Sequence, residues 1–248
     1  MDQTNNNRSP DSAISEFLGV VAHRIHTPVS AINWQAEAML DGMMGELTDE
    51  QKVALQGIIQ SVESLNDFSR TMLYVYELEK DIPMLKAQEI TLLSVLSRVE
   101  KSVLPLLQKK RMHVKHDEAS RSISIVADPD IAFTILRTFL ENAIEYSPDG
   151  SEIGVGVKED SEGALITVED HGCGISSDHI PSIGTKFFRT AEARQNFTDG
   201  AGLDLYIAIN LAERTGGKIT FDSEEGKGSR FHWYVPSTTK RRQPWEGQ

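Results

Sequence analysis

The chain has 248 residues, which is long enough for one large or two modest domains, each with its own hydrophobic core. Hydrophobic residues make up 39% of the sequence and charged residues 25%, an ordinary globular composition that excludes a largely disordered chain. The formal net charge of −12 argues against nonspecific nucleic-acid binding, because no net positive field is present to displace counterions.

The start of the chain and its cysteine content bear on location. The first ten residues are polar and rich in asparagine, so no signal peptide is expected. The sequence contains no run of eighteen apolar residues, the length that a helix needs to span a bilayer. Cys173 is the single cysteine, which rules out an internal disulfide and fits a reducing compartment. We therefore expect a soluble, cytoplasmic chain with no membrane span of its own.

After a disordered lead-in over residues 1–11, the sequence predicts a helical hairpin over residues 12–80. In the first helix, Ser12–Met44, apolar residues recur at steps of three, four and seven, which is typical of helices packed side by side. Thr48 and Gln51 have the spacing of a capping box and begin the second helix. Because such a hairpin cannot cover its own apolar seam, we predict that two copies form a dimeric four-helix bundle.

Residues 81–90 predict a linker, residues 91–236 a second domain, and residues 237–248 a loose tail. A helix over Thr91–Arg111, interrupted at Pro105, leads into this domain. Strands are expected at Met112–Lys115, Ser122–Val126, Glu152–Lys158, Ala164–Glu169, Lys218–Ser223 and Ser229–Val235, with helices from Asp128 or Asp130 to Tyr146 and from Gly202 to Thr215. Because strands and helices are interleaved without strict βαβ alternation, the expected class is α+β, with helices on one face of a mixed sheet.

His23 falls off the apolar seam of the first helix, so we expect its imidazole to face solvent. Pro28 has no N–H to pair with the carbonyl of Arg24, and the helix should bend just beyond the histidine. Taken alone, these residues describe a surface histidine beside a tolerated proline.

Residues in the second domain point to a bound nucleotide when they are combined. Asp170 follows a predicted strand and can accept a hydrogen bond from an exocyclic amine. Asn142 lies on a helix, and its amide oxygen is a hard ligand of the kind that Mg²⁺ accepts beside phosphates. Two glycine pairs allow a tight turn after Asp170 and free N–H groups before a helix, and they are Gly172 with Gly174 and Gly200 with Gly202.

In their order along the chain, these features resemble the conserved boxes of sensor histidine kinases. The residues that carry the resemblance are His23-x-x-x-Thr27-Pro28, Leu140–Pro148, Asp170-x-Gly172-x-Gly174, Phe187-Phe188-Arg189 and Gly200-x-Gly202-Leu203, and together they cover about residues 12–236. The resemblance implies an antiparallel helical hairpin in a dimeric four-helix bundle. An α/β sandwich ATP-binding domain of the histidine kinase/gyrase type is expected to follow it.

The resemblance also implies roles for individual residues. His23 would attack the γ-phosphate of ATP and pass the phosphoryl group to an aspartate of a response regulator, while Thr27 would orient water when that partner is dephosphorylated. Asp170 would read the adenine amino group and Asn142 would bind Mg²⁺. The further residues implied to shape the nucleotide pocket and its lid are Tyr146, Gly172, Gly174, Lys186, Phe188, Arg189, Gly200, Gly202 and Leu203. The signal would come from an upstream sensor or a separate sensor protein.

Three residues depart from the family's pattern. Arg24 stands where an acid usually polarises the histidine, which implies slower proton removal, although a guanidinium can attract the γ-phosphate. Glu145 and Asp204 add negative charge near the expected triphosphate, so either they face away or they weaken ATP binding. They motivate an alternative function: a degenerate, pseudokinase-like binding module that signals by dimer conformation or docks a response regulator without efficient autophosphorylation. A third candidate is a phosphatase-dominant protein working through Thr27.

The remaining candidates indicate packing rather than chemistry. Thr138 occupies the position of the water-activating glutamate of gyrase-type ATPases, and Glu141 points a quarter-turn away, which disfavours efficient ATP hydrolysis. His113 and His116 fall on opposite faces of a strand, so a zinc site is not expected. Cys173 is interpreted as a small apolar filler, and the aromatic side chains interpreted as packing are Trp34, Tyr146 and Trp233.

Overall fold

The computed structural model describes residues 24–25, 28–59, 61–62, 65, 69, 86–190 and 201–237. The chain divides into two compact units, residues 1–83 and residues 84–248, and each is described by itself. His23, Thr27 and Gly200 lie outside the described residues. None of the described helices is long and apolar enough to cross a membrane.

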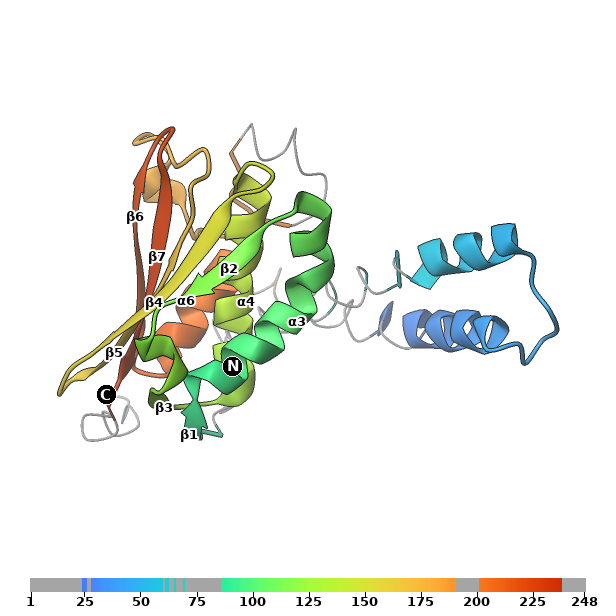
Figure 1. Cartoon of the computed structure of the whole chain (residues 1–248), viewed down its shortest axis with the longest axis horizontal. Coiled ribbons are helices and arrows are strands. Elements are labelled where there is room, and N and C mark those ends of the chain that lie inside the picture. Colours follow the sequence, from blue (N-terminus) through green and yellow to red (C-terminus); the bar gives the residue numbers. More distant parts are fainter. Residues whose placement is uncertain are drawn as a thin grey trace, which may run out of the picture. The chain divides into compact units, whose positions relative to one another are not determined.

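The first unit contains a helical hairpin, with helical residues at 28–40 and 49–59 lying side by side (Figure 1). The predicted capping box is confirmed where the second helix begins. The backbone N–H of Thr48 donates to Oε1 of Gln51 at 2.9 Å, and the backbone N–H of Gln51 donates to Oγ1 of Thr48 at 3.2 Å. These two bonds satisfy N–H groups that have no partner within the helix.

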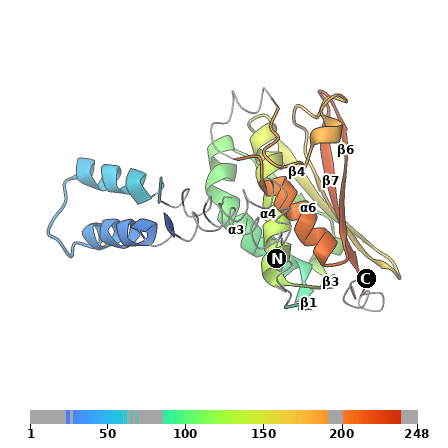
Figure 2. The ribbon, with the colours of Figure 1, turned by 180° about the vertical axis from the view of Figure 1, so that it is seen from behind.

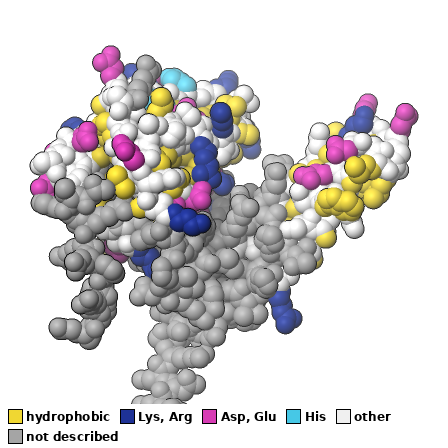
Figure 3. All heavy atoms as spheres, turned by 90° about the horizontal axis from the view of Figure 1, so that it is seen from below, with side chains coloured by type: hydrophobic (Ala, Val, Ile, Leu, Met, Phe, Trp, Pro, Cys, Tyr) yellow, Lys and Arg dark blue, Asp and Glu magenta, His cyan; other side chains and the backbone are white. Residues whose placement is uncertain are grey.

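Several large apolar side chains of the hairpin stay exposed within the chain. Val29 and Leu55 are buried, whereas Trp34 is 65% exposed and Val53 is 68% exposed. Figure 3 shows apolar side chains gathered on this part of the surface. The interpretation of Trp34 as packing is therefore wrong within a single chain, because the two helices of one hairpin cannot cover every apolar side chain that they carry.

The second unit is built on a five-stranded sheet with the strand order β2-β4-β5-β7-β6. The strands are β2 (His113–His116), β4 (Glu152–Glu159), β5 (Gly163–Glu169), β6 (Lys218–Glu224) and β7 (Gly228–Pro236). The β2–β4 pair is parallel and the other pairs are antiparallel, so the sheet is mixed. Three helices, α3 (Leu92–Lys110), α4 (Pro129–Tyr146) and α6 (Asp204–Arg214), cover one face of it (Figures 1 and 2). This arrangement confirms the predicted α+β class.

The hydrophobic core lies between the sheet and the helices α4 and α6. Packing in this core positions the end of α4. Asp128 caps the helix, because its Oδ1 accepts the backbone N–H groups of Asp130 at 2.9 Å and Ile131 at 3.3 Å. Further along, Phe139 is fully buried, and its ring lies 5.5 Å from that of Phe231 on β7. The helix is thus anchored on its buried face, and its last turn is held at one end of the sheet.

Two expectations about the start of this unit are wrong. Gln88–Thr91 forms strand β1, which pairs antiparallel with β3 (Ser124–Ala127), so the predicted linker over residues 81–90 is too long. The helix α3 also runs unbroken through Pro105. Pro105 lies on the exposed side of α3, where solvent can satisfy the carbonyl group that the proline leaves unpaired.

Asp117 follows β2, and its side chain bonds to the neighbouring strand β4. This contact leads to a prediction about stability. Its carboxylate accepts the backbone N–H of Val157 at 2.9 Å, the backbone N–H of Ser120 at 2.8 Å and a short hydrogen bond from the Ser120 hydroxyl. Burial raises the pKa of Asp117, but the hydrogen bonds from Ser120 and Val157 outweigh it, so the pKa lies below its usual value. The charged form is therefore the one that stabilises the fold.

We expect Asp117→Ala to lower the free energy of unfolding by roughly 1 kcal/mol at neutral pH, a value reduced for the exposure of this side chain. Because the folded pKa is depressed, the contribution is present above the unfolded pKa and is lost as the pH falls through the folded pKa. Urea titrations at pH 7 and at about pH 3 measure this difference, with the exposed Glu118→Gln as the control. An equal difference between wild type and Asp117→Ala at both pH values would count against this role.

Candidate functional site

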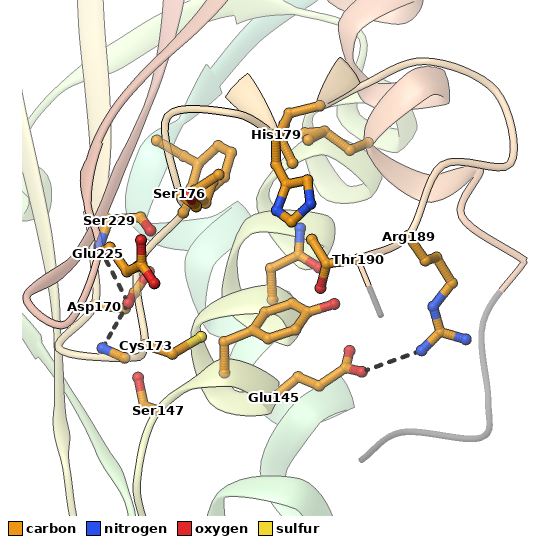
Figure 4. A pocket seen from close by; sticks show the side chains of 18 of the residues that line it. Glu145, Ser147, Asp170, Cys173, Ser176, His179, Arg189, Thr190, Glu225 and Ser229 are labelled. Atoms are coloured by element: carbon orange, nitrogen blue, oxygen red, sulfur yellow. Dashed lines mark hydrogen bonds and ion pairs between the residues drawn. The ribbon is translucent and has the colours of Figure 1, made fainter. Parts of the chain in front are cut away.

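A cavity of about 810 Å³ lies at the carboxyl end of α4 (Figure 4). Its walls come from the loop after β5, the residues that flank the short helix η2 (Ile180–Ser182), the start of α6 and the turn between β6 and β7. A volume of this size is typical of sites that hold a cofactor or another small molecule. The cavity therefore marks the candidate site of this unit.

The last turn of α4 forms one wall, and Lys110 of α3 holds it in place. The Lys110 Nζ donates to the carbonyl oxygens of Ile144 at 2.8 Å, Glu145 at 2.8 Å and Ser147 at 3.0 Å. Carbonyl groups at the end of a helix lack partners within it, and a cation there also complements the helix dipole. Lys110 lines the cavity and supports its wall, a role that the sequence analysis missed because no motif includes this residue.

Asp170 follows β5, in a loop that contacts the end of α4, and is only 6% exposed. Its Oδ1 accepts the backbone N–H groups of Gly172 at 2.8 Å and Ser229 at 3.2 Å. Burial raises the pKa of Asp170 above its usual value, although these two hydrogen bonds oppose the change. No described residue donates a hydrogen bond to Oδ2, so that oxygen can accept one from a ligand. Ser229, which orients the carboxylate, was predicted only as part of a strand.

The glycines after Asp170 are required by backbone packing. A Cβ atom at Gly172 would lie 2.5 Å from the carbonyl oxygen of Tyr146, and one at Gly174 would overlap the backbone of Glu224. Gly174 also has φ +65°, a conformation that side-chain-bearing residues rarely adopt. The loop is therefore pressed between the end of α4 and the β6–β7 turn, and this contact forms the back of the cavity. The expected approach of these glycines to a ligand is secondary to this contact.

A charged pair stands in the same cavity. Oε1 of Glu145 lies 3.9 Å from Nη2 of Arg189, and the two side chains are 28% and 14% exposed. The pKa of Glu145 is raised to about 7, chiefly by burial and also by nearby Asp204, while Arg189 opposes this change. Glu145 and Asp204 both line the cavity. For Glu145, whose carboxylate points toward Arg189 (Figure 4), the possibility that it faces away from the cavity is excluded.

The aromatic side chains in the cavity are neutral near pH 7. Burial raises the pKa of Tyr146 to about 12, so its phenol keeps its proton. The ring of Phe188 lies 6.0 Å from that of His179, and both residues line the cavity. These rings provide flat apolar surfaces of the kind that a nucleotide base contacts.

The structure brings most of the predicted binding residues together but not all of them. Those that line the cavity are Asn142, Tyr146, Asp170, Gly172, Gly174, Phe188, Arg189 and Gly202. Leu203 does not: it is fully buried in the core beneath the start of α6. Lys186 is not a lining residue either. Its Nζ lies 5.2 Å from the ring centre of Tyr206. Arg24 is an exposed helical residue of the first unit.

Three other expectations can be compared with the structure. Cys173 is exposed and lines the cavity, so its interpretation as an apolar filler is wrong; the two glycines beside it turn the loop outward at this point. Trp233 is 1% exposed, which confirms packing. Thr138 is buried, and Glu141 pairs with Arg137 at 2.7 Å without lining the cavity.

Among the described residues, no cluster of three or more histidine, cysteine or acidic side chains could hold a metal ion. His113 bonds Glu152 at 3.0 Å, while His116 bonds Glu100 of α3 at 2.7 Å on the other side of the strand. The expectation that these histidines form no zinc site is in keeping with these contacts.

Comparisons with known proteins identify both parts of the chain. Residues 127–239 match the family model described as "Histidine kinase-, DNA gyrase B-, and HSP90-like ATPase". Residues 13–80 match the model described as "His Kinase A (phospho-acceptor) domain". An ATPase-type nucleotide-binding domain thus follows a phospho-acceptor domain, in the order that the motifs predict. The chain belongs to the sensor histidine kinases and comprises their phospho-acceptor and ATP-binding domains.

Relatives over the whole chain agree with this assignment. The "Sensor protein SrrB" of Staphylococcus aureus strain N315 is 25% identical over 241 residues, covering 93% of this chain and 39% of that protein. The chain therefore spans about two fifths of the length of the curated relatives it matches. Among solved structures, full-length ShkA in complex with AMPPNP has a TM-score of 0.71 at 22% identity, over 90% of this chain and 46% of that one. The Acinetobacter baumannii histidine kinase AdeS has a TM-score of 0.61 at 18% identity, over 87% of this chain and 98% of that one.

Proposed function

We propose that the chain is a histidine protein kinase, which transfers the γ-phosphoryl group of ATP to His23 and then to an aspartate of a response-regulator receiver domain. The observation that carries the proposal is the cavity with the buried carboxylate of Asp170 in its wall, in a chain whose residues 13–80 match a phospho-acceptor domain. The imidazole of His23 is a competent nucleophile near pH 7 because much of it is neutral there.

The donor groups of the cavity suit adenosine triphosphate. Oδ2 of Asp170 can accept a hydrogen bond from the amino group of adenine, an interaction that a base without that group would not make. Arg189 provides a guanidinium for phosphate oxygens at the opposite side of the cavity (Figure 4). The solved structure of ShkA, which contains AMPPNP, is a precedent for an adenine nucleotide in this fold.

Mg²⁺ fits the same arrangement. Asn142 offers one amide oxygen at the cavity, and Mg²⁺ commonly binds through one or two protein ligands together with phosphates and water. When bound, the ion would neutralise the negative charge that develops on the phosphate oxygens. Among the site residues named from the sequence, Asn142 is the only proposed ligand of the ion.

In the proposed step, one imidazole nitrogen of His23 forms a bond to the γ-phosphorus. The bond from that phosphorus to the leaving oxygen of ADP breaks, and the ring proton passes to water or to a nearby base. Arg24 is positively charged and cannot accept this proton, so its expected role is to attract phosphate. Since Thr138 replaces the water-activating glutamate and Glu141 does not line the cavity, transfer to the histidine is favoured over hydrolysis.

The proposed partners follow from the first unit. The exposed apolar side chains of the hairpin support a homodimer, because a second hairpin would cover them. A receiver domain is the expected acceptor, and Thr27 the residue expected to orient water if the kinase also dephosphorylates it. A sensor segment, upstream or in another protein, would supply the signal, and the cytoplasm is the expected site of action.

The alternative function is a binding module that docks a response regulator without efficient autophosphorylation. The observation that favours it is the position of Glu145 and Asp204, whose carboxylates line the cavity where the triphosphate is expected. Micromolar binding of an ATP analogue would remove the main support for this alternative.

The test is incubation of the chain with ATP labelled at the γ-phosphate, in the presence of Mg²⁺. The proposal predicts label that survives alkali and is lost in acid, as a phosphorus–nitrogen bond requires, and that moves to an added receiver domain. Acid-stable label would indicate a hydroxyl acceptor and contradict the proposal. A folded dimer that takes up no label with Mg²⁺ or Mn²⁺ would favour the alternative.

A further inference from the structure

Glu145 and Arg189 face each other across the cavity and come from separate segments. Glu145 stands on the last turn of α4, and Arg189 reaches toward it from the segment after η2 (Figure 4). Their nearest charged atoms are 3.9 Å apart, and both side chains are largely withdrawn from water. Among the described residues, Arg189 provides the only guanidinium in the wall of the cavity, and Glu145 faces it.

Charged groups of both signs surround Glu145. Arg189 faces it, and the ammonium of Lys110, which is bonded to three carbonyl oxygens, adds a second positive charge. Asp204 on α6 and Glu141 on α4 add negative charge to its surroundings. An added polyphosphate would bring still more negative charge into this wall.

A nucleotide and Glu145 therefore need the same partner. Phosphate oxygens bind a guanidinium through the same charge-assisted hydrogen bonds that a carboxylate makes. A phosphate that binds Arg189 would bring new negative charge beside a half-buried carboxylate whose nearest oxygen is 3.9 Å from the guanidinium, which is unfavourable. The pair thus opposes the binding of phosphate, whereas a ligand without phosphate would leave it intact.

We propose that Glu145 is an internal competitor for nucleotide phosphate, which holds Arg189 in the empty cavity and sets the affinity for nucleotides according to their phosphate charge. This inference rests on the proposed function, since it assumes that the cavity binds an adenine nucleotide. It assigns to Glu145 a role in specificity: the residue weakens the binding of ATP and ADP and does not change the binding of adenosine.

The experiment compares Glu145→Gln with wild type by calorimetry against an ATP analogue, ADP and adenosine, at a fixed Mg²⁺ concentration. We expect the variant to bind ADP and the analogue about five to ten times more tightly, and adenosine within about twofold of wild type. Glu141→Gln is the matched control, because it removes a nearby negative charge from the same helix without touching Arg189: Glu141 pairs with Arg137 and does not line the cavity. This control should leave all three affinities within about twofold.

A second variant tests the competition for Arg189. Arg189→Met should weaken ADP binding at least about threefold more in the Glu145→Gln background than in wild type, because there the guanidinium no longer faces the Glu145 carboxylate. Retained adenosine binding shows that each variant is folded.

Two results would overturn the inference while leaving the proposed function in place. The first is that the Glu145→Gln variant binds ADP with an affinity within about twofold of that of wild type. The second is adenosine binding that tightens as much as ADP binding, which would indicate a change in packing. If wild type and every variant, though folded, bound neither the analogue, ADP nor adenosine, the proposed function and this inference would both fail.

Discussion

Replacing His23 by alanine should reduce acid-labile phosphorylation of the chain to background, a loss of more than about 100-fold. The proposed acceptor is a ring nitrogen, and alanine has no nucleophile to replace it. Nucleotide binding belongs to the second unit, so the variant should bind the ATP analogue as wild type does. Labelling with γ-phosphate and calorimetry measure these two properties separately.

The control for this variant is His26→Ala, which removes the other imidazole of the same segment. On the predicted helix, residues 23 and 26 are separated by about 4.5 Å along the axis, so a γ-phosphate placed against one ring is not placed against the other. We expect His26→Ala to retain labelling within about threefold of wild type. If instead label were lost with His26→Ala and kept with His23→Ala, the assignment of the acceptor would be wrong.

Replacing Asp170 by asparagine should weaken binding of the ATP analogue by roughly 30- to 100-fold, or about 2–3 kcal/mol. The asparagine oxygen can still accept the backbone N–H groups of Gly172 and Ser229, so the loop keeps its shape. The amide NH₂ would replace Oδ2, however, and would present a donor where adenine presents its own donor. The variant should therefore lose adenine while keeping the fold.

The matched control is Glu169→Gln, since Glu169 is the neighbouring carboxylate on β5 and pairs with Arg230 at 2.7 Å, away from the cavity wall. It should leave analogue affinity within about twofold. A nucleotide whose base has an oxygen in place of the adenine amine should bind Asp170→Asn relatively better than wild type. Equal affinity of wild type and Asp170→Asn for the ATP analogue would show that Asp170 does not read the base.

Much of the fold could be predicted from local patterns. The capping box of Thr48 and Gln51, the helix that begins after Asp128 and the strand pair around Gly226 all depend on residues close in sequence. Strand β1 was assigned to a linker because its partner β3 lies more than thirty residues along the chain, and its short sequence has no pattern of its own. The break expected at Pro105 was wrong because packing of the buried face holds α3 together across the proline.

The site was predicted less completely, for a related physical reason. The order of the motifs brought Asn142 and Asp170 into one hypothesis, and both line the cavity. Lys110 and Ser229 were missed because each acts through contacts between segments that are distant in sequence. A motif also gives no information about side-chain direction: Leu203 belongs to one, yet it packs into the core.

The most direct test of the central claim is a crystal structure of the chain with a non-hydrolysable ATP analogue and Mn²⁺ in place of Mg²⁺. We predict that the adenine amine lies within hydrogen-bond distance of Oδ2 of Asp170. The anomalous signal of the metal should fall between the phosphates and the amide oxygen of Asn142. An analogue bound outside the cavity between α4 and the Asp170 loop, or a metal with no contact to Asn142, would contradict the account.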